Sequence, residues 1–433
     1  MPEPYGTGDG EMDRGRWRRA YNRLVCAVAV FAIGLSGWTL WGLWERRHTV
    51  DEACGGLVPV GEVLALPGSG GGITPARNLT DGIRLDEAPL PQSCVLRSEE
   101  AAEERRLGES GSFFSAQVAT EPTGRTSEPV DDAFEDALGH TDPYVGVPQV
   151  YQPIGGGVPG HVTGTGASVR LPCPGTEHRG EEITAIRVSA GLDAATRAGF
   201  SGNGRLAQDV RDRLARIAVA TANNLAAELG CPDRLPGPPG GVPALNTEPV
   251  APDEAEGTCA WYGRAGLDDS PANGSGWLPD RVLEARTGDR VWQERCLLSV
   301  TGEARGAVYR RYARDPEYRR FRENSSMDDK TWWMSAESFF GDAAERVSTD
   351  PVGDDRTAVA GRGGYDPDGK ILWATSVCGG EPAVHTLTVS WPYVDGVARH
   401  LEPVLRAYAE DVAERRGCTD TVLPPKGDYP GES

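Results

Sequence analysis

Hydrophobic residues at helical spacing predict two long amphipathic helices, one before Gly230 and one before Gly417. The matching positions are Val210, Leu214, Ile217 and Leu225 in the first, and Val397, Leu401, Val404 and Val412 in the second. This spacing keeps one apolar face toward a core, and a glycine after the last turn suits the positive φ of a helix C-cap. Upstream, residues 186–189 and 387–390 alternate apolar and polar side chains, which predicts half-buried strands. Short strands followed by one closing helix indicate α+β domains rather than βαβ units.

A longer apolar run, residues 24–44, contains 21 residues without a charge. At 1.5 Å per residue it spans about the 30 Å of a bilayer core, so it predicts a transmembrane helix. Basic residues are denser before the run than after it, which predicts a cytoplasmic tail at residues 1–23 and an extracellular C-terminal part. The preceding arginines are Arg14, Arg16, Arg18, Arg19 and Arg23, and tryptophans that suit the outer headgroup region are Trp38, Trp41 and Trp44.

Three other interpretations of this N-terminal segment agree less well with its residues. A cleaved signal peptide fits less well because the apolar run exceeds a usual signal core and no A-x-A site follows it. Arg18 and Arg19 resemble half of a twin-arginine signal, but the residues after them match that pattern poorly. Cys26 lies at the start of the run, not at its end as in a lipoprotein signal. The prediction is therefore a single-pass anchor in the cell membrane, with cleavage left open.

Eight cysteines follow the apolar run. Their spacings are 40, 79 and 58 residues in the first four and 37, 82 and 40 in the second four, which suggests a duplicated domain. An even number outside the membrane predicts four disulfides. The cysteines are Cys54, Cys94, Cys173, Cys231, Cys259, Cys296, Cys378 and Cys418.

Four cysteines per half allow three connectivities in each. The third cysteine of each half stands beside a predicted strand, and the fourth follows the helix that must pack back on that sheet. A bridge between them would hold helix to sheet, and the first two cysteines would then form the other bridge. The predicted pairs are Cys173–Cys231, Cys378–Cys418, Cys54–Cys94 and Cys259–Cys296.

The repeat divides the ectodomain. The first copy is expected over residues 51–231 and the second over residues 259–420. Between them, residues 232–258 hold seven Pro and four Gly, a composition typical of an extended, somewhat stiff linker. Residues 421–433 are expected to form a disordered tail.

The opening of the first copy carries a resemblance. Residues 54–64, Cys-Gly-Gly-Leu-Val-Pro-Val-x-x-Val-Leu, resemble the Cys-x-Leu-Leu-x-Pro-x-x-Val opening of actinobacterial envelope proteins and lipoproteins of unknown function. Some of those proteins adopt PsbP-like α+β sandwiches, so the resemblance implies an envelope protein of that fold class. A ratio of 41 Arg to three Lys also looks like a GC-rich genome. The match covers little more than one short helix and a later cysteine, and the second copy opens differently, with Cys259-Ala260-Trp261-Tyr262.

Composition and sequence motifs limit the classes of function that are possible. With 39% hydrophobic and 25% charged residues the chain is a folded protein, and its net charge of −20 disfavours nucleic acid as a partner. No nucleophile elbow, Walker loop, dinucleotide fingerprint followed by a helix, or His-Glu-x-x-His motif occurs. We therefore predict no catalytic residue, cofactor or metal, while enzymatic activity stays open.

Three weaker features are best explained structurally. The histidines lack zinc-ligand spacing and are expected at surface or edge positions: His48, His140, His161, His178, His385 and His400. An acidic cluster that could hold Ca²⁺ or perform acid–base chemistry is better explained as a solvated helix: Asp131, Asp132, Glu135, Asp136, His140 and Asp142. Residues 365–369 resemble part of a calcium loop but lack its later acid, because Thr375 stands there, and a hairpin turn before a strand at 371–377 is expected instead.

One segment, residues 309–322, runs against the acidic background with six arginines among four aromatics. Such residues can bind phosphate polymers or anionic headgroups through bidentate hydrogen bonds and stacking. The alternative, which the sequence favours, is two short helices split at Pro316, with the aromatics in the core and the arginines paired to acids. The candidate anion-binding residues are Arg310, Arg311, Arg314, Arg319, Arg320 and Arg322.

Two functions from different classes fit the sequence. The first is a non-catalytic, membrane-tethered envelope module that binds a partner protein, peptide or wall polymer. The second is an envelope hydrolase with an unrecognised carboxylate-based site. Duplicated, disulfide-linked domains without a catalytic constellation favour the first function.

Overall fold

The computed structural model defines most of the chain. The described residues are 10–76, 80–103, 111–121, 150–192, 206–238, 240–246, 248–267, 276–288, 290–315, 332–349, 356–368, 370–390 and 393–430, without the side chains of 10–20, 32–39 and 346. The fold is α+β, with two antiparallel sheets and four disulfides, as predicted.

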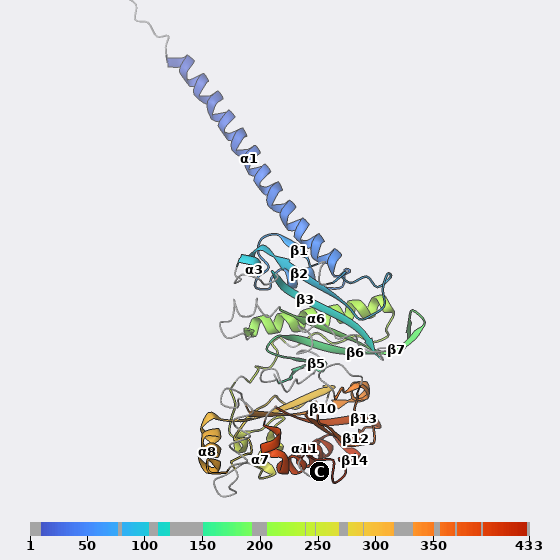
Figure 1. The fold of residues 1–433 in the computed structure, drawn as a ribbon. Coiled ribbons are helices and arrows are strands. Elements are labelled where there is room, and N and C mark those ends of the chain that lie inside the picture. The colour runs from blue at the N-terminus through green and yellow to red at the C-terminus, as the bar shows by residue number, and fades with distance from the viewer. Residues whose placement is uncertain are drawn as a thin grey trace, which may run out of the picture.

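Helix α1 (Gly10–Ala53) projects from the folded body as a single long rod (Figure 1). Only its C-terminal end joins the body, where Val50 and the adjoining Cys54 are fully buried in the first hydrophobic core. Among the residues that the structure describes, no helix is apolar over a stretch long enough to cross a bilayer.

The first half is a seven-stranded antiparallel sheet with one long helix against it. Helix α6 (Gln208–Leu229) packs on β6 and β7. The short helix α2 (Val60–Val63) contacts α1 and α6, and α3 (Glu99–Glu103) contacts β2 and β3. In spatial order the strands are β1 (Ile73–Pro75), β2 (Gln92–Ser98), β3 (Ser112–Glu121), β7 (Glu181–Gly191), β6 (Gly166–His178), β5 (Val158–Val162) and β4 (Gln152–Gly155).

The second half contains the other sheet. In spatial order its strands are β11 (Gly364–Asp366), β12 (Ile371–Cys378), β13 (Glu381–Val389), β10 (Trp332–Phe340), β9 (Gln293–Val300) and β8 (Arg281–Leu283), with β14 (Cys418–Val422) also paired to β12. Its helical segments are η1 (Pro252–Glu254), α7 (Ala260–Arg264), α8 (Gly302–Tyr312), η3 (Gly341–Arg346), α10 (Val394–Val397), η4 (Ala398–His400) and α11 (Leu401–Arg416).

The two sheets repeat one path. Read from the edge nearest the start of each half, the order β1-β2-β3-β7-β6-β5 corresponds to β8-β9-β10-β13-β12-β11. Among the described strands, β4 has no counterpart in the second sheet and β14 has none in the first. The two halves thus share an order of six strands.

The closing helices follow the predicted pattern. Every residue of the two apolar stripes is buried. Helix α6 ends at Gly230 with φ 78°, and α11 ends at Gly417 with φ 65°, both in the left-handed region that a glycine cap supplies. The strand predicted at 371–377 is β12, and residues 364–366 form the hairpin partner β11.

All four predicted disulfides are present. Cys54–Cys94 and Cys259–Cys296 tie each domain entry to β2 or β9, with Cα–Cα distances of 5.2 and 5.0 Å. Cys173–Cys231 and Cys378–Cys418 tie β6 or β12 to the end of the closing helix, at 5.0 and 4.0 Å. The cysteine pattern therefore fixed both the number and the pairing of the bridges.

The segment predicted to be an extended linker is packed along both halves. Leu235 and Val242 are buried in the first core, and Asn223 of α6 both accepts from the Leu235 amide and donates to its carbonyl. Further on, Val250 pairs with Val282 of β8. Apolar side chains among the prolines thus hold this segment against the protein surface.

The tail predicted to be disordered is folded as far as Pro430. Strand β14 occupies its start, and Tyr429 is buried in the second hydrophobic core. The prediction, which followed from the terminal position of the segment, was wrong for residues 421–430. Burial of the large Tyr429 ring removes apolar surface from water and favours packing of this end of the chain on the core.

A layer of charged residues joins the halves. Arg170 of β6 contacts Glu121 of β3 and reaches across to Asp342, at 2.7 Å in both cases. Thr184 of β7 donates to the same Asp342 carboxylate at 2.7 Å. Arg170 alternates with the core residues of β6, so this contact uses the sheet face opposite to α6.

The second sheet contributes a more deeply buried pair to the same layer. Arg295 of β9 lies 2.9 Å from Glu337 of β10, and both side chains are only 2% exposed. Arg295 also donates to the Tyr151 hydroxyl of the first half at 2.6 Å. His161 completes the junction between the rings of Tyr151 and Trp292. The halves are therefore joined by specific polar contacts in addition to the segment that connects them.

Candidate functional site

The predicted arginine segment is partly described. Arg310 and Arg311 lie in the last turn of α8, and Arg314 follows the helix. All three are exposed. Arg319, Arg320 and Arg322 fall outside the described residues, as does the second helix that was expected after Pro316.

Helix α8 begins at a fixed point on the sheet. The hydroxyl of its N-cap, Thr301, accepts from the Ala304 amide at 3.2 Å. The Asp280 carboxylate accepts hydrogen bonds from both the amide and the hydroxyl of Thr301, each at 2.7 Å. At the opposite end, Arg310 and Arg311 complement the negative end of the helix dipole. The local sequence therefore specifies both ends of the helix.

An aromatic cluster anchors the inner face of α8. Tyr309 meets Trp332 edge-on with ring centroids 5.9 Å apart, and Tyr312 lies 5.7 Å from Trp277. Trp277 and Trp332 stack at 5.2 Å. The expectation that the aromatics of this segment face the core is thus confirmed for the two tyrosines that are described.

The arginines behave differently from the aromatics. Among the described residues, no carboxylate lies within 4.0 Å of Arg310, Arg311 or Arg314, although the sequence favoured such pairs. The guanidinium of Arg311 lies 5.9 Å from the centroid of the Tyr312 ring, a cation–π contact. These arginines therefore present positive charge and hydrogen-bond donors to the solvent.

Helix α8 also lies far from α1. Figure 1 shows α1 leaving one end of the body and α8 near the opposite end, on the second sheet. A ligand at α8 would consequently meet the protein on the side remote from the N-terminal helix.

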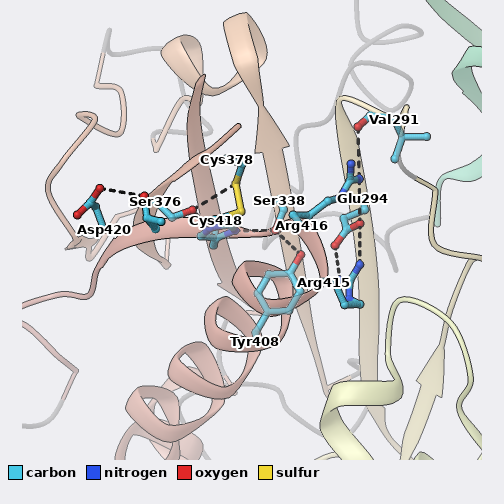
Figure 2. Close-up of a disulfide and its surroundings, with 12 residues drawn as sticks. Val291, Glu294, Ser338, Ser376, Cys378, Tyr408, Arg415, Arg416, Cys418 and Asp420 are labelled. Atoms are coloured by element: carbon cyan, nitrogen blue, oxygen red, sulfur yellow. Dashed lines mark hydrogen bonds and ion pairs between the residues drawn. A yellow bond between two sulfur atoms is a disulfide. The ribbon is translucent and has the colours of Figure 1, made fainter. Parts of the chain in front are cut away.

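His385 is not at the surface or sheet edge where the sequence analysis placed it. It is fully buried on β13, with Nδ1 2.8 Å from the Ser338 hydroxyl and Nε2 2.8 Å from the Ser376 hydroxyl. Ser338 in turn donates to the Tyr408 hydroxyl of α11 at 2.8 Å (Figure 2). Burial, together with the charge of Arg415, lowers the pKa of His385 to about 3. The sequence signal was its parity with Leu387 and Val389, which places all three on the core face.

This hydroxyl–imidazole chain has the residue types of a nucleophile and its base, but it is closed to solvent. Ser338 and His385 have no exposed surface, and Ser376 and Tyr408 have almost none. Burial raises the pKa of Tyr408 well above its ordinary value. The chain links β10, β12, β13 and α11, so its role is to hold the second core together.

Next to these hydrogen bonds, the carboxylate of Glu294 on β9 forms ion pairs with two arginines at the end of α11. Figure 2 shows Arg415 and Arg416 converging on its carboxylate, with the nearer contact at 2.6 Å. Arg415 also contacts Asp411 one turn earlier on α11, at 2.8 Å. These charges are paired to one another and hold the helix to the sheet.

The remaining candidates carry no described site. Among the residues that the structure describes, no three His, Cys, Asp or Glu side chains gather as metal ligands would. The described part of the segment, residues 365–368, belongs to the β11–β12 hairpin, in which Asp366 accepts from the Asp368 amide at 2.9 Å and pairs with Arg356 at 3.0 Å. His161 is also buried, against expectation. The acidic cluster around Asp131 lies outside the described residues.

No protein-family model, curated protein or solved structure matches this chain.

Proposed function

We propose that this chain is a membrane-tethered, extracytoplasmic binding module of the cell envelope that uses the α8 arginines to hold an anionic wall polymer. The observation that carries the proposal is the group of three exposed arginines without a carboxylate partner among the described residues, on a protein of net charge −20. A guanidinium that no described carboxylate neutralises is available for an external anion.

The exposed apolar side chains of α1 support the membrane tether. Leu24, Phe31, Leu40 and Trp41 are each more than 60% exposed, and no other element covers them. Transfer of such side chains from water to lipid lowers the free energy by roughly 25 cal/mol for each Å² buried. The arginines before residue 24 then keep the N-terminus in the cytoplasm.

The disulfides support the placement of the body outside the cytoplasm. Structural disulfides persist in oxidising compartments, and reducing systems keep cytosolic thiols free. All eight cysteines after the apolar run are bridged, and the free one, Cys26, lies within the run. This division of the cysteines matches a boundary between membrane and exterior.

The chemistry of arginine indicates the class of ligand. Its planar fork of N–H donors matches two oxygens of a phosphate or carboxylate. A membrane lipid is disfavoured at α8 because that helix lies remote from α1 (Figure 1). A phosphate-bearing wall polymer combines the required charge with a location beyond the bilayer.

The hydrolase alternative finds less support. The acid–base residues that the structure brings together, including His385, Glu294 and Glu337, are buried and hydrogen-bonded within the second half. A substrate cannot reach them without disruption of the core. Binding is the function that accessible groups can perform.

The proposal is tested with isolated cell walls and the full-length chain in detergent micelles. We expect the chain to co-sediment with intact walls, to be released by salt, and to stay in solution with walls stripped of their phosphate polymer. Salt sensitivity follows because exposed ionic contacts are screened over a Debye length of about 8 Å at physiological ionic strength. Equal binding to intact and stripped walls would refute the ligand class.

Membrane topology is tested separately in intact cells. An N-terminal tag should be protected from added protease, and a C-terminal tag should be digested. Recovery of a mature protein that begins after Ser36 in the culture fluid would refute the tether.

A further inference from the structure

A surface hollow lies where α1 meets the folded body. Its volume is about 350 Å³. Four of its lining residues come from α1, and two come from α2: Trp44, Arg47, His48, Asp51, Val60 and Gly61.

The walls of this hollow are held in place. Trp44, Arg47 and His48 stand at i, i+3 and i+4, so they share one face of α1. The Trp44 and His48 rings contact each other with centroids 5.3 Å apart. On the other side, Glu62 of α2 pairs with Arg213 of α6 at 2.9 Å, which fixes α2 against the first half.

Two neighbouring arginines of α1 differ in what they contact. Arg46 donates to the carbonyl of Ser69 and so helps to hold α1 to the body. Arg47 faces the hollow, and no carboxylate in the described part of the chain lies within 4.0 Å of it, Asp51 included. The hollow thus contains one guanidinium without a carboxylate partner among the described residues, beside the rings of Trp44 and His48.

The depth of this hollow follows from the proposed membrane tether, on which the inference rests. If the apolar core of the bilayer ends near Trp44, Arg47 stands about 4.5 Å farther along the helix, at 1.5 Å per residue. A bilayer measures about 40–45 Å with its headgroups against 30 Å for its hydrocarbon core, so each headgroup layer is roughly 5–8 Å thick. Arg47 and His48 therefore lie at the level of lipid phosphates.

We infer that this hollow binds the headgroup of an anionic phospholipid from the outer leaflet. Arg47 donates to the phosphate oxygens, and the Trp44 ring lies against the lipid backbone as interfacial tryptophans do. Asp51 offers acceptors for the hydroxyl groups of a polyhydroxylated headgroup such as glycerol. The ligand chemistry is that of a phosphodiester carrying hydroxyl groups, and its source is the bilayer that holds α1.

Native mass spectrometry of the full-length chain in detergent micelles tests the inference. The chain is titrated with phosphatidylglycerol, phosphatidylcholine and inorganic phosphate in separate experiments. We expect one phosphatidylglycerol to bind more tightly than phosphatidylcholine, and Arg47→Gln to weaken that binding about fivefold, as expected for loss of one juxtamembrane cation. Arg47→Lys should retain most of the affinity. Arg399→Gln, an exposed arginine far along the chain in the second half, is the matched control.

Two results would overturn the inference. One is equal binding of the two lipids with no effect of Arg47→Gln. The other is inorganic phosphate bound as tightly as phosphatidylglycerol, which would make the ligand a soluble anion.

Carbonate extraction of cell membranes, run in parallel, separates this inference from the proposed function. Retention in the membrane without lipid selectivity would refute lipid binding in the hollow and leave the tether intact. Release by carbonate would refute the tether, and the hollow with it.

Discussion

The helices α3 and α8 occupy equivalent places in the repeated fold, yet they carry opposite charge. Each follows the second strand of its sheet and is capped by a hydroxyl: Ser98 accepts from Ala101 at 3.0 Å, and Thr301 accepts from Ala304 at 3.2 Å. In α3, Glu99 accepts from the amide of Gly72 at 2.9 Å. Among the described residues, no carboxylate lies within 4.0 Å of Arg310 or Arg311 of α8. One scaffold thus uses the same position for internal structure in one half and for external charge in the other.

The two faces of each sheet differ in a related way. The face toward the closing helix carries the main apolar core in both halves, with a buried hydroxyl–imidazole cluster added in the second half. The face between the halves carries Arg170, Arg295 and their acidic partners. Buried ion pairs stabilise little compared with apolar contacts, but they penalise any docking that leaves a charge unpaired. The charged layer therefore contributes more to the specific orientation of the two halves than to the free energy of their association.

The largest expected effect concerns the bridges that hold helix to sheet. Removal of Cys173–Cys231 or of Cys378–Cys418, by double substitution to Ala, should each lower the free energy of unfolding by about 4 kcal/mol in the chain-entropy model. Because the sequence separations are 58 and 40 residues, the two losses should be similar. Chemical denaturation followed by circular dichroism measures both. A loss below about 1 kcal/mol in one half only would break the equivalence of the halves.

The next effect compares buried with exposed ion pairs. Arg295→Met should cost about 3 kcal/mol of stability, because Glu337 would be left as an uncompensated buried charge. The control is Arg84→Met: its partner Glu87 is well exposed, and the expected loss is under about 1 kcal/mol. Equal losses in thermal melts of the two variants would show that the layer between the halves is open to water.

The smallest effect is a pH dependence in the same layer. Burial alone would raise the pKa of Glu121, but Arg187 and Arg170 lower it below the ordinary 4.5. A depressed folded-state pKa contributes stability above the unfolded value, and that contribution is lost as the pH falls through the folded value. Glu121→Gln should therefore flatten the decline in melting temperature below pH 4.5. An unchanged decline in that variant would assign the acid sensitivity to other carboxylates.

The sequence predicted the features that depend on local spacing. Apolar stripes located α6 and α11, their glycine caps set their ends, and cysteine spacing gave the bridges. It failed where contacts between distant segments decide burial. Arg170 and Arg187 alternate with core residues and so look solvent-facing, but the second half packs near that face. No local pattern encodes that docking.

The candidate site at α8 was predictable only in part, because some of its features depend on local spacing and others on contacts with distant segments. The aromatic spacing indicated that Tyr309 and Tyr312 face the core, whereas the lack of carboxylates beside Arg310 depends on which loops surround α8. The burial of His385 could have been predicted, since its parity on β13 matches Leu387. Because histidine is polar, the sequence analysis placed it at the surface or at a sheet edge instead.

The binding role of α8 is tested most directly by calorimetric titration of the full-length chain with poly(glycerol phosphate). The triple variant Arg310→Gln, Arg311→Gln, Arg314→Gln is compared with the wild type and with a control that removes three exposed arginines elsewhere, Arg84, Arg399 and Arg406. We expect the α8 variant to bind at least tenfold more weakly at physiological salt and to melt at the wild-type temperature, because each charge-assisted hydrogen bond contributes roughly 1.5–3 kcal/mol before screening. The control should change affinity less than twofold. Equal weakening in both triple variants would reduce the binding to net charge and contradict the account.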